Sequence, residues 1–239
     1  MSVASVAGLE LRAEGGVVVA TLDAPSGNTM SLAMCEALTS VLREPPQDAH
    51  VLVIEARGAD FCLGRERAAT TAAEMVDEVA RLTALNEALA ESRLVTVAKV
   101  QGDTAGFGVG IVALCDVAVT VRSARFWFPE VALGLAPTLV LAWLPTIIGR
   151  RDAFWLTATG EKIDGDEAAR LGLVNQSVED SAALDGEIAR RVAALTERSP
   201  SVHAGIRSML QISHPVTSEF ASTVAADRLV IGSLRRAGA

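Results

Sequence analysis

Three short apolar runs, each about the length of a β-strand, recur between residues 51 and 121 of this chain. They are Val51–Ala56, Val95–Val100 and Val117–Val121, and segments long enough to form helices separate them. Continuous apolar runs indicate strands that are buried on both faces, and an intervening helix indicates parallel pairing through a right-handed crossover. Residues 71–93, rich in Ala, Glu and Leu, predict the longest crossover helix. The sequence therefore predicts an α/β fold with a parallel sheet.

The chain begins with a different pattern. Two β-prone runs, residues 9–12 and 17–22, flank a pair of glycines and predict a hairpin. Ser31 then precedes apolar residues at three- and four-residue spacing, and this pattern stops before Pro45. Such spacing behind a serine predicts a capped helix with a sharp end.

Beyond residue 150 the pattern is mainly helical. Asp164 and Glu167 have the spacing of a capping box, and Gly172 is placed to end the helix that they begin. Amphipathic patterns predict three further helices, at residues 182–198, 201–210 and 215–234.

Composition excludes several classes of function. The net charge is −8, from 21 basic and 29 acidic residues, and no basic cluster is present, so we expect no nucleic-acid partner. The first residues lack the basic start and apolar run of a secretory signal. Cys35, Cys62 and Cys115 are far apart and lie in apolar or mixed surroundings, as expected of reduced thiols. We therefore expect a cytoplasmic protein.

Residues 131–149 contain no charged residue and approach the length of a membrane-spanning helix. Pro137, Pro145 and Gly134 would interrupt the helical hydrogen bonds of such a span. A buried loop followed by a core helix is the better interpretation, and we expect no membrane association.

Two glycine-containing loops each follow a predicted strand, at residues 57–66 and 101–110. Taken alone, the first loop could equally be an ordinary connection from a strand to a helix. The second has four glycines at a helix start, where free N–H groups and the helix dipole favour negative charge. It matches neither the dinucleotide-binding fingerprint nor the phosphate-binding loop of nucleotide hydrolases.

Glu130 follows Pro129 in apolar surroundings, where desolvation would raise its proton affinity and suit it to acid–base catalysis. In isolation it could also be an exposed carboxylate at a helix cap. The histidines His50, His203 and His214 are scattered without metal-ligand spacing, so we expect no metal site. A serine hydrolase is disfavoured because no Gly-x-Ser-x-Gly elbow is present.

Several of these segments resemble the enoyl-CoA hydratase/isomerase (crotonase) superfamily, in the same order and at similar spacing. The resembling segments are Asn28 after Asp23 and Pro25, the turn from Phe61 to Gly64, the loop and helix from Gly102 to Asp116, the stretch Phe128-Pro129-Glu130 with Gly134 and Pro137, and residues 159–174. The resemblance implies a ClpP/crotonase-like spiral of repeated ββα units with a C-terminal helical region. It further implies a catalytic acyl-CoA-binding core at residues 1–180 and a helical oligomerisation region at residues 181–239.

The resemblance also implies a site. The backbone N–H groups of Arg65 and Phe107 would form an oxyanion hole for the thioester oxygen, and Glu130 would be the catalytic base. Substrate or coenzyme A would contact a set of loop residues made up of Phe61, Leu63, Gly64, Gly106, Gly108 and Gly110. Coenzyme A would be part of the substrate, with no separate cofactor, and the partner assembly would be a homotrimer or a dimer of trimers.

One departure from the family pattern affects the predicted reaction. Gly110 stands where hydratases of the family carry a second glutamate, which favours moving a 3-enoyl double bond to the 2 position with one carboxylate. Asp103 could instead supply a second acid, as in a hydratase, although a turn-forming role is more ordinary for it. A non-catalytic acyl-CoA binder is a further alternative. The side chains of Arg65 and Arg67 would either meet CoA phosphates or form a solvated charged face.

Overall fold

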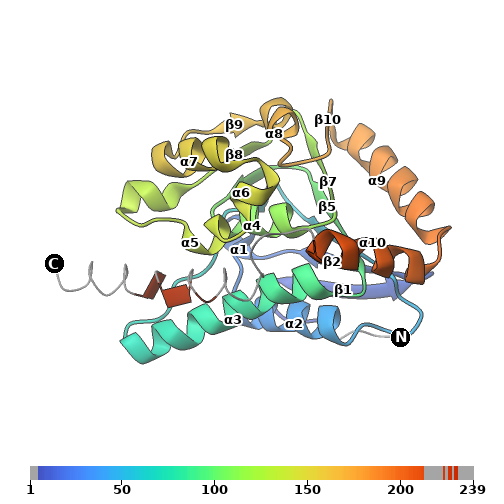
Figure 1. Cartoon of the computed structure of the whole chain (residues 1–239), viewed down its shortest axis with the longest axis horizontal. Coiled ribbons are helices and arrows are strands. Elements are labelled where there is room, and N and C mark those ends of the chain that lie inside the picture. The colour runs from blue at the N-terminus through green and yellow to red at the C-terminus, as the bar shows by residue number, and fades with distance from the viewer. Residues whose placement is uncertain (1–4, 213–222, 224–225, 228, 231–239) are drawn as a thin grey trace.

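The computed structural model describes residues 5–212, 223, 226–227 and 229–230. Its strands form two sheets, and helices cover their outer sides (Figure 1). The larger sheet has six strands in the order β1-β2-β3-β5-β7-β10. Their bounds are Leu9–Glu14, Val17–Leu22, Val51–Ala56, Val95–Val100, Val117–Val121 and Gln176–Val178. β1 and β2 form the predicted antiparallel hairpin, and β2, β3, β5, β7 and β10 pair in parallel.

The smaller sheet has four very short strands in the order β4-β6-β8-β9. They are Asp60–Cys62, Asp103–Ala105, Arg125–Trp127 and Ile163–Asp164. β4, β6 and β8 each follow a strand of the larger sheet within a few residues, and a helical segment follows each of them. This repetition is the ββα spiral expected for the superfamily. The sequence did not predict these strands individually, because two or three residues show no alternation of polar and apolar side chains.

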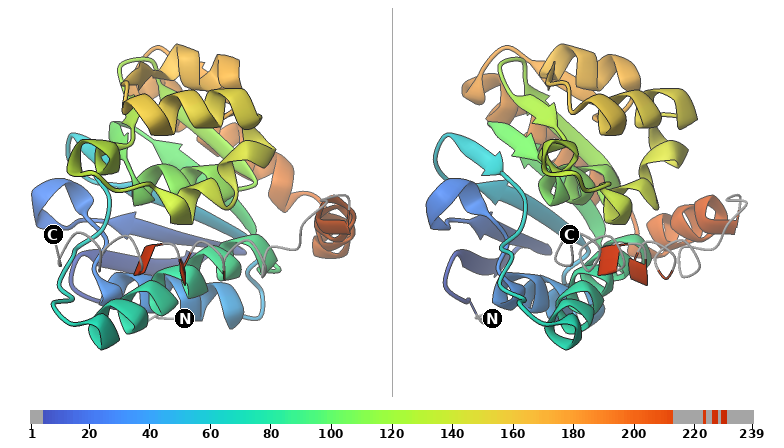
Figure 2. Two further views of the ribbon diagram at one scale, coloured as in Figure 1. Left: turned by 60° about the vertical axis from the view of Figure 1, so that its left-hand side comes forward. Right: turned by 90° about the vertical axis from the view of Figure 1, so that its left-hand side faces the viewer.

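The helices in the first half of the chain connect successive strands. They are α1 Pro25–Asn28, α2 Leu32–Arg43, α3 Ala72–Glu91 and α4 Phe107–Leu114. Figure 2 shows α2 and α3 side by side along one flank of the molecule, with α7 and α8 on the opposite flank. α4 is apolar throughout and buried along nearly its whole length, so it lies inside the protein.

Residues 131–149 form short helical pieces instead of one long core helix. These are η1 Pro129–Leu133, α5 Thr138–Leu141 and α6 Leu144–Ile147. The two prolines lie at the starts of α5 and α6, where a missing backbone N–H removes no helical hydrogen bond. Across the residues that the structure describes, no helix combines the length and apolarity needed to cross a bilayer.

Local capping signals explain where several helices begin. Ser31 caps α2 by accepting a hydrogen bond from the Met34 amide, as predicted. In α8, Gly165–Leu171, Asp164 accepts from the Glu167 amide, but the Glu167 side chain pairs with Arg170 instead of completing the predicted capping box. Gly172 ends this helix in the left-handed conformation that glycine adopts without strain.

The remaining helices are α7 Arg150–Thr159, α9 Ser181–Thr196 and α10 Pro200–Ile212. α9 buries Leu184 and Ile188, and the side chain of Asp185 pairs with Lys99 of β5 at 2.7 Å. The helix predicted at residues 215–234 lies mostly outside the described residues. The division at residue 180 therefore stays a prediction.

Candidate active site

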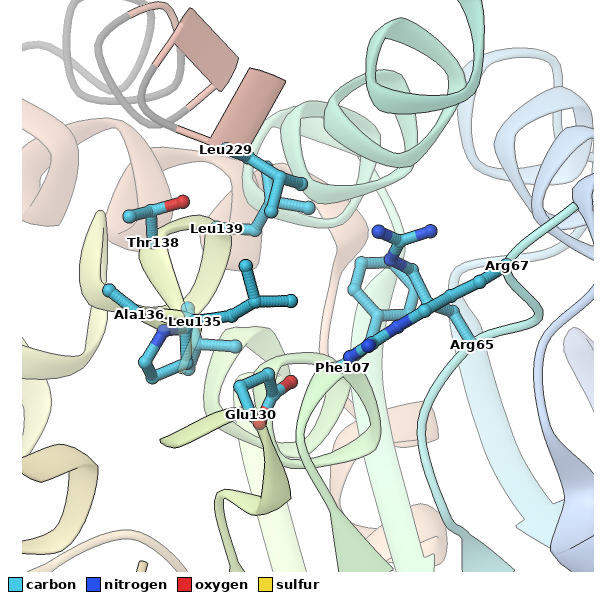
Figure 3. Close-up of a pocket in the computed structure, with 11 residues that line it drawn as sticks. Arg65, Arg67, Phe107, Glu130, Leu135, Ala136, Thr138, Leu139 and Leu229 are labelled. Carbon is cyan, nitrogen blue, oxygen red and sulfur yellow. The ribbon is translucent and has the colours of Figure 1, made fainter. Parts of the chain in front are cut away.

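A small pocket, partly open to solvent, lies between the two loops that the sequence singled out. Most of its wall is apolar, and Glu130 is the only carboxylate among the described residues that line it. Figure 3 shows Arg67 extending into it toward Phe107 and Glu130. The lining residues are Arg65, Arg67, Phe107, Glu130, Leu135, Ala136, Pro137, Thr138, Leu139, Val140 and Leu229.

The loop that carries Arg65 is held by contacts between distant parts of the chain. Asn28 is buried, and its Nδ2 donates to the carbonyl oxygens of Arg57 at 2.9 Å and Asp60 at 2.8 Å. The Met30 amide donates to the Gly64 carbonyl at 3.0 Å, while the Glu66 amide donates to the Met30 carbonyl at 2.9 Å. These bonds flank Arg65, whose own backbone N–H has no acceptor among the described residues.

The second loop presents an amide at the start of α4. Gly106 has φ +52° and ψ −115°, a combination that residues with a side chain rarely adopt. Its own amide is used, because it donates to the Trp127 carbonyl at 3.0 Å. Phe107 is the first residue of α4, so its N–H has no partner within the helix, and none of the described residues accepts from it. Within the described part of the chain, the two predicted oxyanion-hole amides therefore have no acceptor, and their residues line one pocket.

Glu130 lies in η1, directly behind Gly106. A methyl group at Gly106 would lie 2.4 Å from Glu130 Oε1, so the carboxylate and the loop are in close contact. Glu130 Oε2 is buried and has no hydrogen-bond partner within the described part of the chain. Burial raises the pKa of Glu130, and the positive charges of Arg67 and Arg65 act in the opposite direction. A carboxylate with these properties can accept a proton from a bound molecule.

The side chain of Arg65 follows neither of the two sequence-based interpretations. It is 13% exposed and forms an ion pair with Glu78 of α3, so it neither belongs to a solvated face nor is free to meet a phosphate. Burial lowers the pKa of Arg65 to about 10, and it stays a cation near neutral pH. Arg67 is exposed at the pocket and has no salt-bridge partner among the described residues.

Asp103 does not join the pocket. Its Oδ1 accepts a hydrogen bond from the Arg125 amide at 2.9 Å, which links the loop to β8. The bond joins β6 to β8 across 22 residues, so Asp103 binds a backbone amide without forming the local turn that was the more ordinary alternative. This contact leaves the hypothesis of a second acid without geometric support. Gly110 is buried, and a Cβ there would lie 3.1 Å from Val140 Cγ2. Val140 therefore occupies the direction in which a second glutamate would extend.

The six residues predicted to contact substrate or coenzyme A shape the loops instead of lining the pocket, as far as the described residues show. Phe61 is part of the core, and Leu63 packs over Gly27. A Cβ at Gly108 would lie 2.3 Å from the Cys62 carbonyl oxygen, so this glycine allows α4 to approach β4. Gly64 and Gly106 have positive φ angles of 121° and 52°. Gly110 reaches the site only through its contact with Val140.

The apolar wall formed by α5 and the residues before it was not predicted from the sequence. The signal available for it is the uncharged stretch at residues 131–149, which by itself indicates only a membrane or core segment. Leu135, Leu139 and Val140 of this stretch line the pocket, and Leu229 from the C-terminal region joins them. No group of three or more potential metal ligands occurs in the described residues.

Comparison with known proteins identifies the family of this chain. The sequence profile of the family described as Enoyl-CoA hydratase/isomerase matches residues 12–234. A probable enoyl-CoA hydratase of Rhodobacter capsulatus is 32% identical over 170 residues, which cover 69% of this chain and 66% of the relative. A peroxisomal Delta(3,5)-Delta(2,4)-dienoyl-CoA isomerase of Arabidopsis thaliana is 25% identical over 200 residues, covering 77% of this chain and 71% of that protein.

Among solved structures, an enoyl-CoA hydratase of Mycobacterium smegmatis superimposes with a TM-score of 0.81 at 29% identity. The match covers 92% of this chain and 89% of that one. Fold, loop geometry and sequence profile all lead to one assignment: the chain belongs to the enoyl-CoA hydratase/isomerase family.

Proposed function

We propose that the protein is an enoyl-CoA isomerase that converts a 3-enoyl-CoA into a 2-enoyl-CoA. Glu130 removes a proton from C2, and negative charge moves to the thioester oxygen. The N–H groups of Arg65 and Phe107 stabilise the resulting enolate, each contributing on the order of 3 kcal/mol in comparable sites. Glu130 then returns the proton to C4, and the double bond ends between C2 and C3.

The observation that supports this reaction best is that Glu130 is the only carboxylate among the described residues that line the pocket. One carboxylate suffices when the proton removed from C2 is the proton delivered to C4. Burial raises the pKa of Glu130 above that of an ordinary glutamate, which makes its carboxylate a stronger base toward the proton at C2. Arg67 and Arg65 oppose this effect, so their charges help the carboxylate to stay ionised before the reaction.

Hydration is the alternative, and the relatives named enoyl-CoA hydratase favour it. Adding water to a 2-enoyl-CoA requires groups that position and deprotonate the water and deliver a proton to C2. Val140 fills the space beside Gly110, and Asp103 is bound to a backbone amide away from the pocket lining. These contacts support isomerase over hydratase chemistry.

The direct test compares products from 3-enoyl-CoA and 2-enoyl-CoA substrates of several chain lengths. We expect double-bond migration with the wild type, and E130Q should lower kcat by at least about 100-fold while substrate binding persists. D103N is the matched control and should keep the wild-type kcat. Substantial formation of 3-hydroxyacyl-CoA from the 2-enoyl substrate would favour the hydratase, and binding without turnover would favour a non-catalytic acyl-CoA binder.

We also propose a homotrimer or a dimer of trimers. α10 exposes Val202, Ile206, Met209 and Leu210 at helical spacing, and an apolar stripe of this kind supports burial against another subunit. The three free cysteines support a reducing, cytoplasmic location. Light scattering coupled to size-exclusion chromatography measures the assembly.

A further inference from the structure

The Arg65 amide lies at the start of a segment with no regular structure. Residues 66–70 form neither helix nor strand, and α3 begins only after Thr71. On one side the segment is fixed by the bridge between Arg65 and Met30. A backbone donor in such a segment needs further contacts if its direction is to be constant.

Glu78 of α3 supplies these contacts on the other side. Its Oε1 accepts from the guanidinium of Arg65, and its Oε2 accepts from the backbone amides of Ala68 and Ala69, both at 3.2 Å. Glu78 is 5% exposed, although it carries a carboxylate. One buried side chain thus binds the segment at three successive points.

We propose that Glu78 is a positioning residue that holds the Arg65 amide in the direction required for the oxyanion hole. This inference rests on the proposed function, because that amide acts on a thioester oxygen only in an acyl-CoA enzyme. Glu78 is not among the residues that line the pocket. It acts through the loop that carries Arg65. Figure 3 shows the side chains of Arg65 and Arg67 leaving this loop in different directions.

The physical basis is the sensitivity of an oxyanion hole to geometry. A backbone donor stabilises the enolate only when it already points at the oxygen, and a displacement of about 1 Å can cost about 100-fold in rate. Without the Glu78 carboxylate, the Arg65 guanidinium would be buried without its ion-pair partner and would have to move toward water. The backbone of Arg65 would move with it.

The test uses the full-length protein with a bound 2-enoyl-CoA. We expect E78Q to lower kcat about 10-fold to 100-fold, with a smaller change in KM, because the amide contacts the transition state more strongly than the ground state. Difference infrared spectroscopy of the bound thioester carbonyl reports hydrogen bonding to its oxygen directly. The wild type should lower the stretching frequency relative to the free thioester, and E78Q should lose part of that shift.

Glu74 provides the matched control, one helical turn before Glu78 on α3. It also binds the loop, since its Oε2 accepts from the amides of Thr70 at 2.8 Å and Thr71 at 3.0 Å, but it is exposed. These amides lie farther from Arg65 along the chain than the amides of Ala68 and Ala69 that Glu78 binds. E74Q should weaken the start of α3 and leave both kcat and the carbonyl frequency unchanged. A purely structural role of Glu78 would make E78Q behave like E74Q.

If E78Q does not fold, R65Q/E78Q removes both buried charges and replaces E78Q in the same measurements. Wild-type kcat and carbonyl frequency in the folded variant would overturn the inference while leaving the proposed function intact. A wild type that neither shifts the carbonyl frequency nor converts any acyl-CoA would overturn the proposed function, and the inference with it.

Discussion

Gly106 shows how a single residue meets two requirements of the site. Its backbone conformation, φ +52° and ψ −115°, turns the chain from β6 into α4 and leaves the next amide free. Its missing side chain also makes room for Glu130, whose Oε1 would lie 2.4 Å from a Cβ at this position. Backbone strain and steric overlap therefore act against any other residue here.

At the residue scale we predict that G106A lowers kcat by more than about 100-fold, because it displaces both Glu130 and the Phe107 amide. It should also destabilise the fold by about 1–3 kcal/mol through the strained conformation. Steady-state kinetics and denaturant unfolding measure the two effects.

Gly186 of α9 is the matched control, since a Cβ there would meet no atom within 4 Å. G186A should stabilise the protein by about 0.5–1 kcal/mol, as alanine does in a helix, and leave kcat unchanged. Equal activity of G106A and G186A would show that the close contact between Gly106 and Glu130 is unimportant.

At the scale of elements, Arg207 joins α10 to the core through several hydrogen bonds. Arg207 donates to Asp116 at 2.6 Å and to the carbonyl oxygens of Leu89 at 2.8 Å and Ala90 at 3.0 Å, at the end of α3. Asp116 in turn accepts from the Thr96 amide at 2.7 Å. Asp116 therefore has a structural role.

We predict that R207M loosens α10 from the core, because the partners of a largely buried guanidinium lose their donors. The expected loss of stability is about 1–3 kcal/mol, with faster amide hydrogen exchange in α10 than in α9. R190M is the control, since the Arg190 side chain is exposed and its partner Glu187 also pairs with Arg191, and its effect should stay within about 0.5 kcal/mol. Unchanged exchange in R207M would mean that apolar contacts alone hold α10.

At the scale of the whole molecule, the site lies where the loops after β4 and β6 meet the segment after β8. The small sheet places these loops side by side, since β4 pairs with β6 and β6 with β8. This assembly buries the carboxylate of Glu130, and its Oε2 has no hydrogen-bond partner among the described residues. Burial of this kind links the stability of the fold to pH.

Because burial raises the pKa of Glu130, the native state favours the protonated form more than the unfolded state does. The free energy of unfolding of the wild type, compared with that of E130Q, should therefore fall with rising pH. The fall begins near the ordinary glutamate pKa of about 4.3 and continues up to the raised pKa of Glu130 in the folded protein. We predict that E130Q is more stable than the wild type near neutral pH and that this gain disappears in acid. Urea unfolding across the pH range measures it, with E161Q at an exposed glutamate as the baseline. A gain that is independent of pH would contradict the raised pKa.

The sequence predicted those parts of the fold that depend on neighbours along the chain. The apolar runs of β3, β5 and β7, the Ser31 cap and the glycine-rich turn before α4 are local patterns, and the structure contains each of them. The family resemblance added the roles of the Arg65 and Phe107 amides as oxyanion hole and of Glu130 as base, and these three residues lie at one pocket. Contacts between distant segments could not be predicted in the same way, and the side chain of Arg65 is the clearest case.

By itself, the amino-acid sequence determined the strands β1, β2, β3, β5 and β7, the start of α2 and the positions of the two glycine loops, because hydrogen bonding and apolar periodicity within a few residues decide them. Only the tertiary structure decided that Glu78 binds Arg65, that Val140 fills the space beside Gly110 and that Asp103 turns to Arg125. Each of these outcomes depends on which segments become neighbours after folding. It also depends on the free-energy cost of leaving a buried charge unpaired or interior space unfilled.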